Sequence, residues 1–506
     1  MWKRFTFEDI RIIAHYLGTL TSLFSVALLI PLVTAIIFQE WEPATRYLLA
    51  GGISLTIGSL LRMAKIEPGR LTQQQAMALT GFVWMVLAFV ASVPLAMSGH
   101  YASYLDALFD GVSGLTTTGA SLIMDLEHLS YADNMWRFVM HFLGGMGLIV
   151  IALSLGLLSS STSGLYSSEG RSEHVVPNVI TTTRLISKIS LTVIGIATIL
   201  LMLFCLVAGM EPVRALLHGL WISISGFMTA GFTPTSQSIM YYHSYFLEVA
   251  CMILMLLGMV NFGLFVAVWR GKTHLFFKDM EIRTGLIWIV FMGIVFMATL
   301  SSTQLFSDVL TMLRRGVFMM MSAASTTGFQ IVTTNQLITV FSSGAILILA
   351  ILMAVGGSSG STAGGMKLSR IGLTAKSIVS SIKEAIAPDS ARVSVVYHHI
   401  GKQVLNNDIA RAAMTVSTLF VVTYVIGALA GIAHGYDATA SIAESVAMAS
   451  NGGLSFGITT QGMPSTLEAI YILEMWAGRL EFITLIALIV KIVVSVLPAR
   501  KTRGQR

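Results

Sequence analysis

Thr116-Thr117-Thr118-Gly119-Ala120 is a short, hydroxyl-rich stretch centred on one glycine, and the chain contains four stretches of this kind. The other three read Met228-Thr229-Ala230-Gly231-Phe232, Ser325-Thr326-Thr327-Gly328-Phe329 and Ser450-Asn451-Gly452-Gly453-Leu454. Their central glycines recur at intervals of about 100 residues, and such recurrence indicates repeated copies of one structural unit. The four stretches therefore predict a fold built from four similar units.

The similarity extends upstream of each central glycine. A predicted helix of about three turns leads into each stretch, and a serine stands six residues before the first three glycines, at Ser113, Ser225 and Ser322. The fourth copy has Ala447 at this position and is the most divergent. Two long apolar runs separate consecutive stretches, so each predicted unit is a long helix, a short helix with its loop, and a second long helix.

The rest of the chain is strongly apolar. Of its 506 residues, 55% are hydrophobic and only 11% are charged, a composition that excludes a soluble globular protein. Runs long enough to cross a hydrocarbon core predict about ten spans, near residues 12–38, 45–64, 76–97, 135–161, 185–209, 244–270, 284–301, 337–376, 410–434 and 467–497. The predicted fold class is an all-α polytopic membrane protein with four re-entrant pore loops in pseudo-fourfold helix–pore loop–helix units.

The distribution of positive charge predicts the orientation. Lysine and arginine near span ends stay preferentially in the cytoplasm. If the N-terminus is cytoplasmic, every lysine falls in or beside a cytoplasmic segment, whereas outer segments carry acidic residues such as Glu40, Asp125 and Asp308. The sequence therefore predicts a multi-pass protein with both termini in the cytoplasm. Its net charge of +6 reflects this orientation and does not indicate nucleic-acid binding.

Loops at membrane depth need a physical reason, because non-helical backbone there must be buried or line water. Glycine tolerates positive φ, so four loops can turn their carbonyls to one axis and surround a dehydrated cation. The negative ends of the preceding short helices also favour a cation. Close helix packing explains the small residues of any single loop as well as a filter does. It does not explain four such loops in equivalent places. The candidate filter residues are Thr116, Thr117, Thr118, Gly119, Thr229, Ala230, Gly231, Thr326, Thr327, Gly328, Asn451, Gly452 and Gly453.

Nearly the whole chain resembles the Trk/Ktr/HKT superfamily of potassium transporters, most closely its bacterial TrkH-type subunit. The resemblance is carried by five stretches: residues 114–120, Leu143-Gly144-Gly145-Met146-Gly147, Asn261-Phe262-Gly263, the glycine-rich residues 356–367, and Gly478-Arg479-Leu480-Glu481. It implies potassium uptake across the bacterial cell inner membrane, with potassium bound as substrate by the filter backbone. Met228 and the Asn451-Gly452 pair depart from the threonine-rich pattern, which puts strict selectivity over sodium in doubt.

The resemblance also implies partners and a division of the chain. TrkH-type subunits form homodimers and assemble with a cytoplasmic RCK-type regulator that binds NAD or ATP. The chain itself has no phosphate loop, so no cofactor is expected on it. The implied parts are an extra N-terminal helix pair at 1–70, pore units at 71–170, 171–280 and 281–400, the third with a gating loop, and a fourth unit with the tail at 401–506.

The glycine-rich run 356–365 interrupts a predicted span. Ten residues without a side chain larger than threonine do not sustain a helix, so a loop is expected on the cytoplasmic side of the filter. The resemblance favours a gate, and a static kink is the alternative. We expect Lys367 to anchor the inner end of the loop by snorkelling. The candidate gate residues are Gly356, Gly357, Gly360, Gly364, Gly365 and Arg479.

Charged residues within the spans form a second group of candidates. Arg479 is expected to face the pore, because a cation within a span is usually functional. The resemblance implies that it acts as a barrier to cations, and the alternative is an ion pair with Glu474 or Glu481. His141 is read as a buried packing residue. Asp110 and His218 lie before filters and either attract cations or form a solvated mouth, and segments 162–184 and 377–409 are candidate partner contacts or plain connectors.

The alternative function is a sodium- or proton-coupled secondary cation transporter, that is, a symport mechanism. Such carriers are commonly built from inverted repeats, whereas the four units here repeat directly. Enzyme motifs such as HExxH and a Ser/His/Asp constellation are not evident, so no enzymatic activity is predicted.

Overall fold

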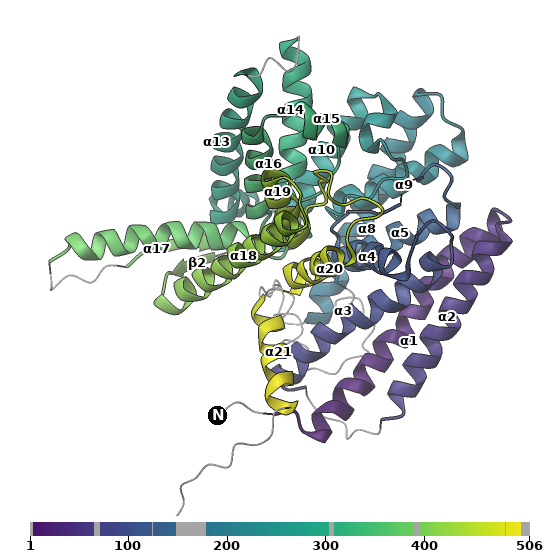
Figure 1. Cartoon of the computed structure of the whole chain (residues 1–506). Helices are drawn as coiled ribbons and strands as arrows, with labels where there is room; N and C mark the ends of the chain where they lie inside the picture. The colour runs from purple at the N-terminus through teal and green to yellow at the C-terminus, as the bar shows by residue number, and fades with distance from the viewer. Residues whose placement is uncertain are drawn as a thin grey trace, which may run out of the picture.

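The computed structural model describes residues 4–64, 71–123, 125–147, 179–302, 308–388, 394–399, 401–480 and 482–496. Within these ranges nearly all regular structure is helical, which confirms the predicted all-α class (Figure 1). The exception in the described part is an antiparallel hairpin of β1 (Val396–His399) and β2 (Gly401–Val404). The inner part of predicted span 135–161, the boundary at residue 170 and most of segment 162–184 lie outside the described residues.

The chain begins with a pair of long apolar helices, α1 (Phe7–Ile37) and α2 (Trp41–Arg62). Thr6 starts α1 with a capping box, in which its side chain accepts from the Asp9 amide and Asp9 accepts from the Thr6 amide. Gly18 and Gly58 let the two helices touch, because a Cβ on Gly18 would lie 2.6 Å from the Gly58 carbonyl oxygen. The pair packs against α3 and α5 of the next segment.

Four units of similar element order follow, and each has a short helix ending at one of the four loops. The first unit contains α3 (Gln73–Ala96), α4 (Tyr104–Thr116) and α5 (Tyr131–Gly145). The second contains α8 (Val179–Val207), α9 (Pro212–Phe227), the 3-10 turn η1 (Ser238–Tyr242), α10 (Tyr245–Met259), α11 (Phe262–Trp269) and α12 (Thr273–Lys278).

The third unit contains α13 (Met280–Ser302), α14 (Val309–Ala324), α15 (Thr334–Thr339), α16 (Ser343–Val355) and α17 (Leu368–Ile386), followed by the hairpin. The fourth contains α18 (Asn407–Ala433), α19 (Ala438–Ala449), α20 (Ser465–Leu480) and α21 (Phe482–Val496). The segment 377–409 therefore holds the end of α17 and both strands, a hairpin that the sequence analysis did not predict.

The short helices α4, α9, α14 and α19 interlock the units in a cycle. Each packs against the first and second long helices of its own unit. Each also packs against the second helix of the preceding unit: α9 on α5, α14 on α10, α19 on α16, and α4 on α20 of the last unit. The fourth unit thus closes onto the first, where α20 lies beside α4 (Figure 1).

The second helix of every unit stops soon after passing its loop. The last helical residues are Gly145 in α5, Met259 in α10, Val355 in α16 and Leu480 in α20. In the second unit the chain resumes as α11 after a bend of 98°. In the third unit, residues 356–367 separate α16 from α17.

The breaks also affect the number of spans. Among the described residues, six helices are long and apolar enough to cross a membrane, and the bent pair of α10 and α11 adds a seventh. Three further predicted spans, 135–161, 337–376 and 467–497, are interrupted by the breaks or run outside the described residues, so the predicted total of about ten stays a prediction. Large exposed apolar side chains, such as Leu286 and Phe291 on α13, give the bundle a surface suited to lipid.

Candidate functional site

The four loops share an unusual backbone conformation. Two residues before each central glycine the chain is left-handed: φ is +58° at Thr117, +48° at Thr229, +55° at Thr326 and +52° at Asn451. Such values cost about 1–3 kcal/mol for residues other than glycine and cluster at functional sites. The central glycines then take φ of +86°, +90°, +89° and +61°. Sequence repetition is thus matched by repetition of the backbone.

One hydrogen bond fixes this conformation in every copy. The amide of the residue before each central glycine donates to the carbonyl five residues upstream, which is the Schellman pattern that ends a helix. The donors and acceptors are Thr118 to Ser113 (2.9 Å), Ala230 to Ser225 (2.9 Å), Thr327 to Ser322 (3.0 Å) and Gly452 to Ala447 (2.7 Å). Because the bond uses the backbone carbonyl, Ala447 serves as well as a serine.

The four loops close into a ring of backbone. A Cβ added to each central glycine would collide with the carbonyl oxygen of the residue before the next central glycine. The contacts run from Gly119 to Ala230, from Gly231 to Thr327, from Gly328 to Gly452, and from Gly453 back to Thr118. The central glycines are therefore required both by positive φ and by close approach of the neighbouring loop. We call this closed arrangement of the four loops the ring.

Side-chain bracing of the ring alternates between loops. In the first loop the hydroxyls of Thr116 and Thr118 lie 2.8 Å apart, and Ser325 and Thr327 repeat this pair at 2.8 Å in the third. The second and fourth loops have no hydroxyl pair at these positions. In the fourth loop, Asn451 Nδ2 instead donates to Thr118 Oγ1 at 2.9 Å and to the Met475 carbonyl at 2.9 Å.

Buried carboxylates hold the chain that leaves the first and fourth loops. Asp110 accepts hydrogen bonds from Tyr101, Ser121 Oγ at 2.7 Å and the Leu122 amide at 2.8 Å. Glu444, at the equivalent place nine residues before its central glycine, accepts from the Phe456 amide at 2.6 Å and from Thr459. Glu444 was not predicted from the sequence, although its spacing to Gly453 matches that of Asp110 to Gly119.

Of the two alternatives for Asp110 and His218, the solvated mouth is therefore wrong, and attraction of cations stays a prediction. Asp110 is 0% exposed and His218 is 4% exposed. His218 Nδ1 lies 2.6 Å from the Tyr242 hydroxyl, inside a cluster of aromatic rings. Both side chains are buried away from open water. Their hydrogen bonds to neighbouring residues give them a structural role around the loops. His141 is also fully buried, against Phe232, as the sequence predicted.

Polar contacts also join the first and second units beyond the ring. Glu127 Oε1 accepts from the Ser236 amide at 2.9 Å and from Ser236 Oγ at 2.7 Å. Burial alone would raise the pKa of Glu127, but the hydrogen bonds from Ser236 hold that pKa below its usual value. The segments that follow the first two loops are thereby tied to each other.

The glycine-rich segment is a loop, as its composition predicted. It extends from Gly356 to Lys367 between α16 and α17, and we call it the glycine loop. Thr362 Oγ1 lies 2.8 Å from the Gly258 carbonyl, 3.1 Å from the Phe227 carbonyl and 3.1 Å from Thr229 Oγ1. The glycine loop is therefore fastened to the second loop of the ring.

The glycine loop touches two more corners of the ring through Gly364. The amide of Gly364 donates to Thr326 Oγ1 at 2.8 Å in the third loop. A Cβ on Gly364 would collide with the Ser450 carbonyl oxygen in the fourth loop. Gly356 and Gly365 have φ of +66° and +69°, so the path of the glycine loop depends on these glycines.

Arg479 completes the contacts at the remaining corner. Its guanidinium donates to Thr117 Oγ1 in the first loop at 3.2 Å, to the Thr362 carbonyl in the glycine loop at 3.2 Å, and to the Gly144 carbonyl at the end of α5. It also lies 5.7 Å from the centre of the Trp84 ring. Arg479 therefore links the ring, the glycine loop and α5.

The alternative of an ion pair with a nearby glutamate receives no support from Glu474. That side chain accepts from Ser445 Oγ at 2.9 Å and lies against Gly427. Glu481 lies outside the described residues. Lys367 Nζ donates to the Ala363 carbonyl within the glycine loop, and its anchoring at the membrane interface stays a prediction.

The space beside the glycine loop is small and bordered by cations. A cavity of about 20 Å³ lies among the glycine loop, Asn451 and Arg479, and Lys367 and Arg370 also line it. A single water needs about 10–15 Å³, so this cavity has no room for a hydrated ion. Of the predicted gate residues, Gly364, Gly365 and Arg479 line this cavity. Gly357 lies against Met259 and Gly360 lies against Asn261.

Four repeated units of apolar helices, closed in a cycle around a backbone ring, define a multi-pass membrane protein of the transporter and channel class. Residues 45–496 match the TrkH family, described as cation transport protein. The chain therefore belongs to the TrkH family, and its resemblance to the Trk/Ktr/HKT superfamily is confirmed.

Relatives and a solved structure agree over almost the full length. The chain is 30% identical to an uncharacterized cation transporter of Methanocaldococcus jannaschii, over 96% of each chain. It is also 30% identical to the Trk system potassium uptake protein TrkH of Halomonas elongata, over 95% of this chain and 98% of that protein. The crystal structure of the potassium transporter TrkH from Vibrio parahaemolyticus superposes with a TM-score of 0.80 at 24% identity, covering 94% of this chain and 98% of that one.

Proposed function

We propose that this protein takes up potassium across the bacterial cell inner membrane, with the ring as its selectivity filter. The observation that carries the proposal is the cyclic closure of the four loops, from Gly119 through Gly231 and Gly328 to Gly453. Backbone carbonyls arranged in this way can replace the hydration shell of a cation. The loops contain no charged side chain, so the ligands are the backbone and hydroxyl oxygens of the predicted filter residues.

The helices that lead into the ring support a cation as the substrate. All four loops follow directly on the C-terminal ends of short helices, which carry partial negative charge. Relatives named as potassium uptake proteins support potassium among the cations. Met228 and Asn451 make two loops different from the threonine-rich first loop, and strict discrimination against sodium rests on the backbone rather than on side chains.

The glycine loop and Arg479 are proposed as the gate. Together they contact all four corners of the ring, and the cavity beside them has no room for a hydrated ion. Conduction then requires the glycine loop to move and Arg479 to release Thr117. A fixed positive charge next to the path also opposes a permeating cation.

The remaining parts of the proposal concern assembly and orientation. We propose a homodimer with both termini in the cytoplasm, associated with an RCK-type regulator that binds NAD or ATP. Support comes from the excess of lysine in the segments assigned to the cytoplasm and from relatives named as members of a Trk system. The regulator would act on the glycine loop, and the nucleotide would be bound by the partner.

The deciding experiment measures flux into liposomes that contain the purified protein. Uptake of potassium should be competed by rubidium and far less by sodium, and it should follow the membrane potential alone. Uptake that requires a sodium or proton gradient, in a fixed ratio, would instead favour a coupled symporter. Absence of rubidium competition would contradict the filter.

A further inference from the structure

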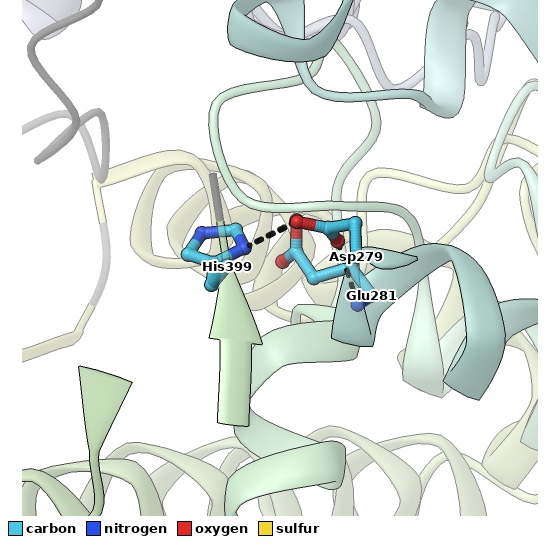
Figure 2. Close-up of side chains that lie close together, drawn as sticks. All are labelled: Asp279, Glu281 and His399. Atoms are coloured by element: carbon cyan, nitrogen blue, oxygen red, sulfur yellow. Dashed lines mark hydrogen bonds and ion pairs between the residues drawn. The ribbon is translucent and has the colours of Figure 1, made fainter. Parts of the chain in front are cut away.

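Three side chains with metal-binding chemistry meet at the base of α13, away from the ring. Asp279 caps α13, Glu281 lies in its first turn, and His399 ends strand β1 of the hairpin (Figure 2). His399 stands more than a hundred positions after the two carboxylates in the sequence, and the fold brings it to them. The Asp279 and Glu281 side chains are 0% exposed, and the His399 side chain is 10% exposed.

Both carboxylates are oriented by backbone amides. Asp279 Oδ1 accepts from the Glu281 amide at 2.8 Å, while its Oδ2 lies 3.1 Å from His399 Nδ1. Glu281 Oε1 accepts from the Ser359 amide at 2.8 Å and the Ser369 amide at 3.1 Å, while its Oε2 lies 3.9 Å from His399 Nδ1. One oxygen of each carboxylate is thus held in place, and the other faces the imidazole. Hydrogen-bonded carboxylates of this kind are typical of metal ligands.

The spacing of the donor atoms suits an ion. One ligand atom from each residue lies within 4.8 Å of the other two. Two ligands of a tetrahedral zinc ion, each bonded at about 2.0–2.1 Å, stand about 3.4 Å apart, close to the observed 3.1 and 3.9 Å. One imidazole with two carboxylates favours zinc or a similar transition metal over magnesium or calcium, which prefer oxygen alone.

We propose that Asp279, Glu281 and His399 form a binding site for a divalent transition-metal ion, with Zn²⁺ as the preferred ion. This site is additional to the ring and takes a different class of ion. A hydrogen-bonded ion pair of His399 with Asp279, without a metal, is the alternative that the experiment must exclude.

The site connects the hairpin to the glycine loop. Glu281 Oε1 bonds the Ser359 amide in the glycine loop and the Ser369 amide at the start of α17, while His399 brings in β1. A bound ion would therefore fix the hairpin, α13 and the glycine loop to one another. An effect of this link on conduction rests on the proposed gating function of the glycine loop, whereas binding of the metal does not.

Titration of the purified full-length protein with metal alone tests the site. Protein freed of any polyhistidine tag is titrated with Co²⁺, whose visible absorption reports coordination geometry, and Zn²⁺ is then used to displace it. We expect one Co²⁺ per chain, displaced by Zn²⁺, and at least tenfold weaker binding in His399→Ala and Glu281→Gln. His398→Ala is the matched control, because this neighbour on β1 points to the opposite, exposed face.

The outcomes are distinguishable. Equal binding by wild type, His399→Ala and His398→Ala would overturn the site and leave only adventitious binding, and no binding by the wild type would favour the ion pair. Asp279→Asn changes the third ligand but keeps a side chain that can cap α13. Weaker metal binding in this variant therefore does not reflect a failure to fold. Potassium flux with and without Zn²⁺ then tests the link to the glycine loop: a Zn²⁺ effect on flux that is lost in His399→Ala supports it. Specific binding without any effect on flux would overturn the link alone.

Discussion

Asn451 Nδ2 donates a hydrogen bond to Thr118 Oγ1 at 2.9 Å, and so joins the fourth loop to the first at the point where the ring closes. These residues are more than three hundred positions apart in the chain. Asn451 also occupies the left-handed region, with φ of +52°, which asparagine tolerates better than most residues. One side chain thus serves both the local conformation and the closure of the ring.

Two substitutions at Asn451 separate these roles. Asn451→Gly keeps a residue that tolerates the left-handed backbone but loses the hydrogen bond to Thr118. Asn451→Ala loses the hydrogen bond and also places a residue that tolerates this conformation poorly. We expect potassium-over-sodium selectivity to fall in both variants, and thermal stability to fall further in the alanine variant, by about 1 kcal/mol. Permeability ratios in liposomes and melting curves measure the two effects. Unchanged selectivity in both variants would show that ring closure does not need this bond.

Substitution of a central glycine should damage selectivity more than folding. Gly119→Ser and Gly328→Ser place a side chain against the backbone of the next loop, so the carbonyls of the ring must shift. Gly435→Ser is the matched control, because Gly435 has φ of +89° but open space around its Cα. We expect loss of potassium preference only in the two ring variants. If they remain folded and selective, the assignment of the filter is wrong.

Thr362 offers a direct test of the gate. Thr362→Val removes the hydroxyl that bonds Gly258, Phe227 and Thr229, while keeping the shape of the side chain. We expect the freed glycine loop to raise potassium flux in the absence of any regulator, and shortening residues 356–365 should do the same. Ser361→Ala, which loses only a bond to Ser358 within the glycine loop, is the control. Equal open probability in all variants would favour a static kink.

Arg479 should act through its charge. At about 4 Å and an effective dielectric constant near 20, repulsion of a cation amounts to about 4 kcal/mol as an upper bound. Arg479→Ala should therefore raise potassium flux per molecule severalfold, and Arg479→Lys should stay closer to the wild type. Flux is measured beside the yield of folded protein in detergent. A joint fall of flux and yield in Arg479→Ala would identify Arg479 as a structural link and exclude the barrier.

Asp110 should matter for stability rather than for conduction. Asp110→Ala leaves the buried Leu122 amide and Ser121 hydroxyl without their acceptor, at a cost of about 1–3 kcal/mol for each group left unpaired. We expect a lower melting temperature with potassium selectivity retained in the protein that folds. Asp106→Ala at the start of the same helix is a useful comparison, because it removes an end cap instead. A selectivity change at normal stability would argue for a direct role in conduction.

Local signals in the sequence explain what could be predicted. The central glycines could be predicted because the stretches around them repeat along the chain. The glycine loop could be predicted because its composition is incompatible with a continuous helix. The break after Met259 carries only the weaker signal of Asn261, whose side chain caps α11 by accepting from the Gly263 amide. Long-range backbone bonds to the glycine loop flank the 98° bend on both sides. The bond from the Phe262 amide to the Gly360 carbonyl is one such long-range contact.

The site residues that were not predicted from the sequence also acquire their roles only through contacts between distant parts of the chain. Glu444 reads as one polar residue in a short helix, and only the return of the chain to Phe456 and Thr459 gives it a role. Asp279, Glu281 and His399 have no motif spacing, and a four-residue strand is too short to be distinguished from a connector. Spacing within one unit was visible in the sequence, whereas contacts between units were not.

Loops 1 and 3 carry the hydroxyl pair and loops 2 and 4 do not, so the side chains around the ring have at most twofold symmetry. In a pore assembled from four identical chains, one substitution would change every corner at once. Here a single codon change alters one corner and leaves the other three intact. Ion preference in such a protein can be adjusted in small evolutionary steps, each of which leaves most of the ligands around the ion as they were.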